Sequence, residues 1–346
     1  VFQQESPGMR RVLRELKPSQ FEDIISVLAL YRPGPMEFIP KFVHGKHGRA
    51  QVEYPHPVLE PILKDTYGII VYQEQIMQIA ATMAGFSLGE ADLLRRAVSK
   101  KIRKVLDEER AHFVDGCRKQ GFGEEEANRV YDMIVRFADY GFPRAHAAAY
   151  GVLAFRTAYL KCHYPAAFMA AMLTSVMGNH RKVAEYAEEC RRMGIPVLAP
   201  DVNESTALFT PVTHTDPDTG RRTSAIRFGL AAIKNVGFQA IDAIVREREH
   251  GEYADLLDFC RRIDLRACNK RVIESLIAGG AFDRLPGDRA QKMSAMDEMI
   301  EAAAKWKKEK EELQLSLFGF QEQANWTVEL PDMPPFPAAK QLGMEK

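Results

Sequence analysis

The chain has 346 residues, of which 46% are hydrophobic and 27% are charged, and its formal net charge is zero. This is a globular composition, and the length predicts two or three domains. The longest apolar run, residues 147–155, is too short to span a membrane, so no membrane partner is expected.

Cysteine and histidine usage argues against a metal site and an oxidising compartment. The five cysteines have no Cys-x-x-Cys spacing, so reduced thiols in a cytoplasmic protein are the simplest interpretation. His44 and His47 have no second ligand pair nearby, so we expect no bound metal. No signal peptide is visible. Because the chain starts at Val1 rather than Met, we expect the numbering to begin inside a longer protein or at a processing site.

Most of the first 195 residues have helical periodicity. Apolar residues at 21, 24, 25 and 28 predict a helix over 19–30, which ends at the Pro-Gly-Pro of 33–35. A loop is predicted next, and it carries Lys41, His44, Lys46, His47 and Arg49. A helix is expected over 73–84, and a capping box of Ser87 and Glu90 starts another at Leu88. Further helices are expected at 105–119, 124–138, 145–161, 165–177 and 179–193.

The pattern changes at Ile195, after which prolines are frequent. Short runs at 207–213 and 223–229 flank a Pro-Gly turn and predict a β-hairpin. The only Asp-x-Asp of the sequence, Asp216 to Asp218, lies in that turn and is interpreted as part of it. The remaining expected elements are short helical units over 230–248 and 269–282, a charged helix over 298–314 and a proline-rich linker from 322.

Positive charge is concentrated between Arg95 and Lys104, where six of ten residues are basic and none is acidic. On a helix over 88–106, apolar residues occupy one side and basic residues the other. The apolar side holds Ala91, Leu94, Val98, Ile102 and Val105; the basic side holds Arg96, Lys100, Arg103 and Lys104, flanked by Arg95 and Lys101. Like charges at this spacing repel, so the face is either solvated or bound to a triphosphate or nucleic-acid backbone. The charge alone leaves both interpretations open.

Several short sequence segments, called phrases below, resemble segments of one known family and occur in the same order. ADLLRRA at 91–97, followed by Lys100-Lys101, is similar to the fingers motif of bacterial DNA polymerase III alpha subunits, the C family of replicative polymerases. The other similar phrases are VFQQESPGM (1–9), ALYRPGPM (29–36), YGIIVYQEQIM (67–77), YGFPRAHAAAY (140–150), PDVN (200–203) and IKNVG (233–237). The resemblance covers essentially the whole chain. It implies a mainly α fold, with a helical fingers domain, a small β-hairpin insert and a tandem helix-hairpin-helix region.

The resemblance also implies a division into five parts. They are a fingers domain (1–195), a β-hairpin connector (196–229), a tandem helix-hairpin-helix DNA-binding region (230–297), a charged helix with a clamp-binding peptide (298–321) and a linker to a missing C-terminal domain (322–346).

The implied activity is that of a DNA-directed DNA polymerase, a nucleotidyltransferase that uses two metal ions held by palm aspartates. In the family these aspartates precede the fingers, and this chain lacks them. We therefore expect Mg²⁺ in the palm of the parent protein, no cofactor on this chain, and no activity from the chain alone. The expected partners are primer-template DNA, the incoming dNTP, the sliding clamp and other replicase subunits. The competing hypothesis is a non-catalytic DNA-binding or clamp-adaptor module.

By resemblance, Arg95 and Arg96 hold the incoming triphosphate, with Lys100 and Lys101 close by. Such fixed cations would neutralise the charge that develops on the pyrophosphate leaving group. Family members often have Gly where this chain has Ser99, and Ser tolerates a helix better. The helix start at 73–75 offers a second group of polar side chains. Gln73, Glu74 and Gln75 either line the nucleotide pocket or cap the helix.

The resemblance places Arg144 and His146 near the nascent base pair or template, and we assign Arg144 to DNA and His146 to the nucleotide. His146 shares a helical face with Tyr150, so a packed pair is the alternative. Many family members have Asn-Lys-Ser or Asn-Arg-Ser where this chain has Pro-Arg-Ala at 143–145. Further DNA contacts are expected from Arg32, Arg103 and Lys104.

Two helix-hairpin-helix units are expected to offer backbone N–H groups to DNA phosphates. The better hairpin comprises Lys234, Asn235, Val236 and Gly237. Lys270 and Arg271 introduce the second unit, for which ordinary helical packing is the alternative.

Residues Gln314, Leu315, Ser316, Leu317 and Phe318 resemble the peptide that bacterial proteins dock into the sliding clamp. Apolar residues beside a charged helix and a proline-rich segment need a partner. The alternative is that they fold back on the domain.

Overall fold

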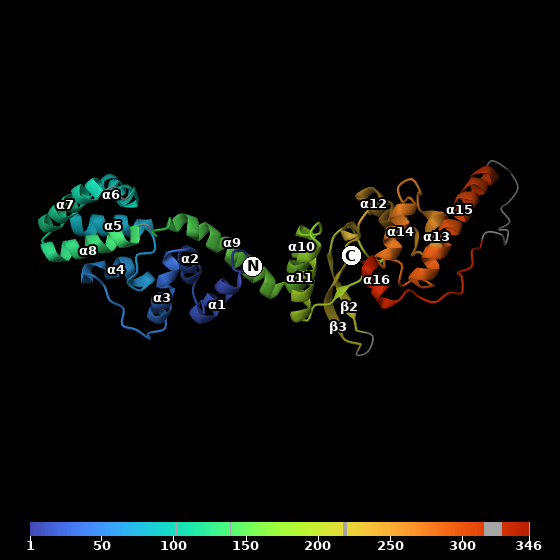
Figure 1. The fold of residues 1–346 in the computed structure, drawn as a ribbon, viewed down its shortest axis with the longest axis horizontal. Coiled ribbons are helices and arrows are strands. Elements are labelled where there is room, and N and C mark those ends of the chain that lie inside the picture. The colour runs from blue at the N-terminus through green and yellow to red at the C-terminus, as the bar shows by residue number, and fades with distance from the viewer. Residues whose placement is uncertain (101–102, 139, 217–219, 315–326, 346) are drawn as a thin grey trace. The chain divides into compact units, whose positions relative to one another are not determined.

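The computed structural model describes the chain except residues 101–102, 139, 217–219, 315–326 and 346. The described part is mainly helical with one three-stranded sheet, which confirms the predicted fold class (Figure 1). Two compact units divide the chain, unit 1 at Val1–Cys162 and unit 2 at His163–Lys346. This division falls at a different place from the boundary that we predicted at residue 195.

Unit 1 is helical. Its elements are α1 (Pro7–Leu16), α2 (Phe21–Leu30), η1 (Pro35–Phe38), α3 (Ile39–Lys46), η2 (Pro57–Leu59), α4 (Glu60–Leu63), η3 (Lys64–Thr66), α5 (Gln73–Ala84), α6 (Leu88–Lys100), α7 (Arg103–Lys119), α8 (Glu124–Ala138) and α9 (Arg144–His163), which ends one residue into unit 2. The capping box at the start of α6 is confirmed, since the Ser87 amide donates to Glu90 Oε2 at 2.8 Å and the Glu90 amide donates to Ser87 Oγ at 3.3 Å.

The loop that we predicted over residues 41–49 is wrong for its first part, because α3 occupies Ile39–Lys46. Pro40 stands in the first turn, where a missing N–H costs nothing. Phe42 and Val43 are buried, and Lys46 donates to the buried Asp23 at 2.8 Å. Tertiary burial therefore stabilises a short helix whose local sequence, rich in basic residues, gave little helical signal.

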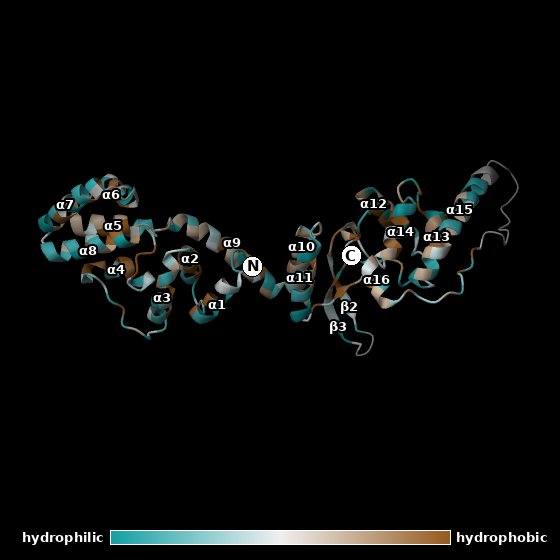
Figure 2. Ribbon diagram, in the orientation of Figure 1, coloured by the Kyte–Doolittle hydropathy of each residue, from teal (hydrophilic) through white to brown (hydrophobic). Residues whose placement is uncertain are grey.

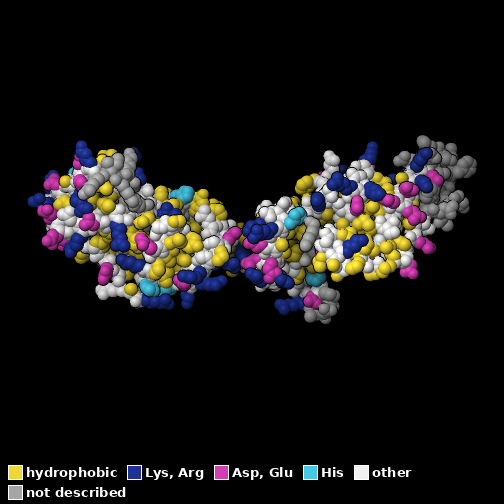
Figure 3. Space-filling model, viewed as in Figure 1, with side chains coloured by type: hydrophobic (Ala, Val, Ile, Leu, Met, Phe, Trp, Pro, Cys, Tyr) yellow, Lys and Arg dark blue, Asp and Glu magenta, His cyan; other side chains and the backbone are white. Residues whose placement is uncertain are grey.

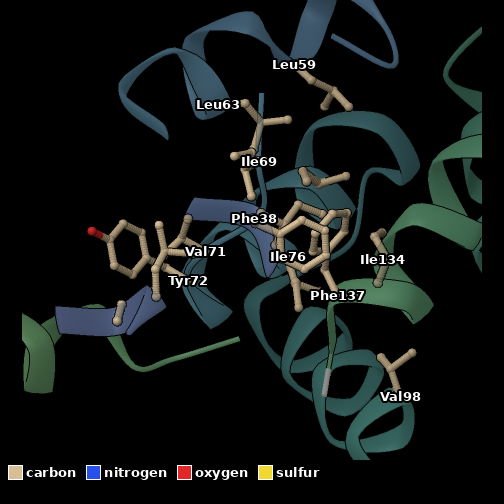
Figure 4. Close-up of a cluster of buried hydrophobic side chains, with 14 of the residues drawn as sticks. Phe38, Leu59, Leu63, Ile69, Val71, Tyr72, Ile76, Val98, Ile134 and Phe137 are labelled. Atoms are coloured by element: carbon tan, nitrogen blue, oxygen red, sulfur yellow. The ribbon is translucent and has the colours of Figure 1, made fainter. Parts of the chain in front are cut away.

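Helix α5 lies at the centre of the unit 1 core and contacts α4, α6, α7 and α8. Its residues Ile79, Ala80 and Met83 have no exposed surface. Figure 4 shows the neighbouring cluster, in which the Phe38 and Phe137 rings lie 4.6 Å apart between centroids. Figure 2 shows α7 as predominantly hydrophilic on its visible side, consistent with a helix that buries only one face.

The prediction of a single helix over residues 88–106 is wrong, because the described residues of this range form two helices. Helix α6 includes Ser99 and ends at Lys100, and α7 begins at Arg103. The two helices contact each other and run antiparallel, because the His112 ring of α7 lies 4.5 Å from that of Phe86, just before α6. This arrangement buries Phe113 completely, which a continuous helix would have carried away from the core.

Unit 2 combines helices with the sheet. Its elements are α10 (Pro165–Ser175), α11 (His180–Arg192), β1 (Val197–Leu198), β2 (Thr210–Thr215), β3 (Arg222–Arg227), η4 (Leu230–Ala232), α12 (Phe238–Glu247), η5 (Arg248–His250), α13 (Leu256–Arg262), α14 (Lys270–Ala278), α15 (Arg289–Gln314) and α16 (Ala338–Met344). The predicted hairpin is confirmed as β2 antiparallel to β3. The sequence did not predict β1, which pairs parallel with β3 in the order β1-β3-β2.

The described part of the predicted C-terminal linker, residues 327–345, packs on unit 2. Val328 and Leu330 contact its hydrophobic core. Gln291 Nε2 donates to the Pro331 carbonyl at 3.0 Å, and Arg289 pairs with Glu345 at 2.8 Å. These contacts explain why a proline-rich stretch is ordered here, although its composition favours a linker. Among the described helices, none is long and apolar enough to cross a membrane.

Candidate nucleotide and DNA interface

Two of the sequence phrases meet each other in unit 1, just before α9. Tyr72 pairs with Phe142 as an isolated parallel bridge. The Phe142 amide donates to the Val71 carbonyl at 3.0 Å, and the Gln73 amide donates to the Phe142 carbonyl at 3.1 Å. The phrase at 67–77 therefore lies beside the phrase at 140–150, although about 70 residues separate them.

The polar side chains at 74 and 75 cap helices. Gln75 is buried, and its Oε1 accepts from the amides of Val71 and Tyr72 at 2.8 and 3.0 Å. Both carboxylate oxygens of Glu74 lie 3.0 Å from the Arg144 amide, at the first residue of α9. Of the two interpretations left open by the sequence, the structure shows capping contacts for these two residues.

Gln73 points to a different partner. Its Oε1 accepts from Arg95 Nη1 at 3.2 Å, which connects α5 with the basic helix α6. Asp92 Oδ1 also accepts from Arg95 Nε at 2.8 Å, and its Oδ2 lies 2.8 Å from Arg96 Nη2. These interactions, led by the hydrogen bond from Arg95, lower the pKa of the Asp92 carboxyl. One carboxylate thus joins the two arginines, and the spacing of three and four residues was visible in the sequence.

The apolar side predicted for the basic helix is buried where it is described. Ala91, Leu94 and Val98 are at most 1% exposed, whereas the Arg96 side chain is 63% exposed. Burial of one side therefore presents the arginines on the other. Lys104 lies on α7, where its exposed ammonium is 4.0 Å from Glu108. Lys100 ends α6, Arg103 begins α7, and Lys101 lies outside the described residues.

Arg144 and His146 lie on the first turn of α9. Arg144 Nη2 donates to Glu22 Oε2 at 2.8 Å, which raises the pKa of the guanidinium further. The His146 ring stacks on Tyr150, with centroids 4.5 Å apart and planes 29° apart. The packed pair that we weighed is therefore present. A polar cavity of about 480 Å³ adjoins this turn, lined in part by Glu22, Tyr72, Glu74 and Arg144.

Arg32 makes contacts inside unit 1. Its Nε donates to the Ala29 carbonyl at 2.9 Å and its Nη2 donates to the Tyr140 carbonyl at 2.7 Å. The guanidinium carbon lies 4.3 Å from the centre of the Phe142 ring. Burial lowers the pKa of this arginine.

The first hairpin of unit 2 has the geometry expected of a turn before a helix. Asn235 has a φ of 67°, in the left-handed region, and Val236 is buried. Gly237 precedes α12 with open space where a side chain would stand, and no side chain caps the helix. The first amides of α12 are therefore accessible to an anion beside the exposed Lys234.

The second hairpin unit begins at a helix start where a side-chain cap and an ion pair are already present. Asn269 caps α14 by accepting from the Val272 amide at 3.2 Å. Lys270 pairs with Asp297 of α15 at 2.7 Å, and this hydrogen bond raises the pKa of the lysine. Arg271 is exposed on the first turn of α14.

The PDVN phrase makes contacts within unit 2. Asn203 exchanges two hydrogen bonds with the Tyr253 backbone, at 2.8 and 3.0 Å. Asp201 is buried, and its amide donates to the buried Ser205 Oγ at 2.9 Å. The phrase thus joins the segment before β2 to the segment between α12 and α13.

Of the predicted clamp-binding residues, Gln314 is the last residue of α15. The remaining four, Leu315 to Phe318, lie outside the described residues. On the visible face in Figure 3, basic and acidic side chains are interspersed in each unit, so cations gather only locally.

Comparison with known proteins gives these sites a context. Residues 1–121 match the family described as bacterial DNA polymerase III alpha subunit finger domain, and residues 194–292 match a helix-hairpin-helix motif. The DNA polymerase III subunit alpha of Bacillus subtilis (strain 168) is 52% identical over 303 residues, which cover 88% of this chain and 26% of that protein.

The subunit of the same name from Staphylococcus aureus (strain MRSA252) is 46% identical over 302 residues, covering 87% of this chain and 27% of that protein. The chain therefore spans about a quarter of the length of these curated relatives. It belongs to the bacterial DNA polymerase III alpha subunit family, of which it carries the finger domain and the helix-hairpin-helix region.

Proposed function

We propose that the chain is the part of a replicative DNA polymerase that binds the triphosphate of the incoming dNTP and contacts primer-template DNA. One observation carries this proposal: Arg95 and Arg96 lie on one helix, joined by Asp92, and Gln73 of a second helix fixes Arg95 from the other side. Two guanidinium groups held in this way suit a polyphosphate, because their forked donors match phosphate oxygens.

The catalytic step belongs to the parent polymerase. The palm carboxylates and their Mg²⁺ ions would supply the two-metal chemistry of nucleotidyl transfer. The part played by this chain is to bind and orient the triphosphate and to neutralise the charge that develops on pyrophosphate. The chain alone is expected to be inactive as a polymerase.

Unit 2 contributes DNA and partner binding in this proposal. The uncapped start of α12, with Lys234 and Gly237, would hold a DNA phosphate without reading sequence. The segment from Gln314 to Phe318 would dock the sliding clamp, which rests on its resemblance to clamp-binding peptides. Other replicase subunits are expected to bind the parent protein.

Binding measurements on this chain test the proposal directly. Arg95→Ala and Arg96→Ala should each weaken binding of a fluorescent dNTP at least about tenfold, because each removes charge-assisted hydrogen bonds to phosphate. Binding of a short DNA duplex should change less than about twofold. Arg110→Ala is the matched control, because Arg110 pairs with Asp132 on α8 of the same unit. An equal loss of duplex binding in both arginine variants would instead make α6 a DNA-backbone contact.

A further inference from the structure

The chain that leads into α9, residues 140–143, is held from one side by Arg32. The side chain leaves the turn after α2 and donates to the carbonyls of Ala29 and Tyr140 at 2.9 and 2.7 Å. The same guanidinium lies over the Phe142 ring at 4.3 Å. Arg32 therefore ties the end of α2 to a segment more than a hundred residues away.

These contacts use both properties of a guanidinium. Its planar fork donates to two carbonyls, while its flat face covers an aromatic ring. An ammonium group has neither the fork nor the face, so lysine would not reproduce the arrangement. A DNA phosphate would have to compete with both carbonyls and the ring for the same group.

Glu74 holds the same region from the other side. Its two carboxylate oxygens lie 3.0 Å from the Arg144 amide, at the positive end of the 20-residue helix α9. An anion at this position satisfies an amide that the helix leaves unpaired, and it interacts favourably with the helix dipole. Between these two contacts, the Phe142 amide is bound to the Val71 carbonyl.

We propose that Arg32 and Glu74 are positioning residues that fix the α9 lead-in, residues 140–143, and through it Arg144 and His146. The assignment replaces our expectation that Arg32 contacts DNA. The positioning role of Arg32 and Glu74 is inferred from the contacts above. Its consequence for ligand binding rests on the proposed function.

Arg32→Lys and Arg32→Met separate the two roles. In a positioning role, both variants should speed hydrogen exchange of the Phe142 amide by about tenfold, because its hydrogen bond to the Val71 carbonyl is weakened. Lysine should not restore the duplex affinity that methionine loses. Arg49→Lys, at an exposed arginine of the same unit, is the matched control and should change neither measurement.

A phosphate contact predicts the opposite pattern. Arg32→Met would then lower the slope of log affinity against log salt by about 0.9, lysine would restore it, and Phe142 exchange would stay as in the unsubstituted chain. That result would overturn the proposal. If the unsubstituted chain bound no duplex, the proposed function would fail. The exchange measurement would still test whether Arg32 positions residues 140–143.

Glu74 provides a second, independent test if the Arg32 variants fold poorly. Glu74→Ala should speed exchange of the Arg144 amide by about tenfold, while Glu74→Gln, which keeps an acceptor oxygen, should speed it less. Unchanged exchange at Arg144 in Glu74→Ala would contradict the positioning role of Glu74.

Discussion

Two groups of basic residues, one in each unit, are used in opposite ways. In unit 1, Arg95 and Arg96 share one carboxylate, and their side chains are 24% and 63% exposed. In unit 2, Lys292 is completely buried, and its ammonium donates to the carbonyls of Phe282, Leu285 and Gly287. The first arrangement leaves cations at the surface, where we propose that a ligand binds, whereas the second uses a cation to hold a turn. Exposure and partners, not the number of charges, separate a binding residue from a structural one.

The α14–α15 turn shows why the buried lysine is structural. An ammonium group has three N–H donors, and three carbonyls of this turn accept from Lys292 at 2.7, 2.8 and 2.5 Å. Nearby, Gly280 has a φ of 81°, and a side chain there would collide with Arg289. Arg289 itself pairs with Asp283 at 2.6 Å. The turn is therefore organised from inside by two cations.

The largest effect is expected from Lys292→Met, at the buried cation of unit 2. The substitution keeps the length of the side chain but removes three hydrogen bonds to carbonyls of this turn, two of them buried, so unfolding free energy should fall by about 2–4 kcal/mol. Denaturant unfolding of the chain measures it. Lys305→Met, at an exposed lysine of the same helix, should stay within about 0.5 kcal/mol. Equal stability of the two variants would show that the turn does not depend on its buried cation.

A smaller effect is expected from Asp92→Asn, which tests the exposed arrangement. Loss of the negative charge beside both arginines should tighten binding of a dNTP by about two- to fivefold at low salt, the range of exposed ion pairs. Titrations at low and high salt measure the change, which should shrink as salt rises. Weaker binding in Asp92→Asn would show that the arginines are held by the charge of Asp92 and not only by an acceptor oxygen at this position. Glu108→Gln, which removes the partner of Lys104, is the matched control.

The sequence predicted the regular elements well where one signal dominated. The predicted helix over 73–84 is confirmed as α5, and the capping box placed the start of α6 correctly. The prediction from sequence failed where burial in the tertiary structure determines whether an element forms. Helix α3 was expected to be a loop because its stabilising contact, Lys46 with Asp23, joins residues 23 apart in the chain. Strand β1 has two residues and exists only because β3 offers it a partner.

The sequence predicted which residues belong to the candidate site but not which of them contact one another. The phrases at 29–36, 67–77, 91–97 and 140–150 were identified separately, and the structure brings them together through Arg32, Gln73, Glu74 and Arg95. The roles proposed from resemblance stay predictions for Arg95 and Arg96. For Arg32, the inward contacts carry the different role proposed above.

The sequence by itself determined the family, the mainly α fold and the amphipathic character of the basic helix, because these depend on local phrases and on periodicity along the chain. Only the tertiary structure decided which cations remain available at the surface. In the sequence, Arg32 and Lys292 looked no different from Arg96. In the structure, backbone carbonyls accept hydrogen bonds from Arg32 and Lys292, whereas Arg96 pairs with a carboxylate on the exposed side of its helix. The physical reason is that a carbonyl acceptor has no sequence signature, since every residue carries one, and only folding places it against a particular side chain.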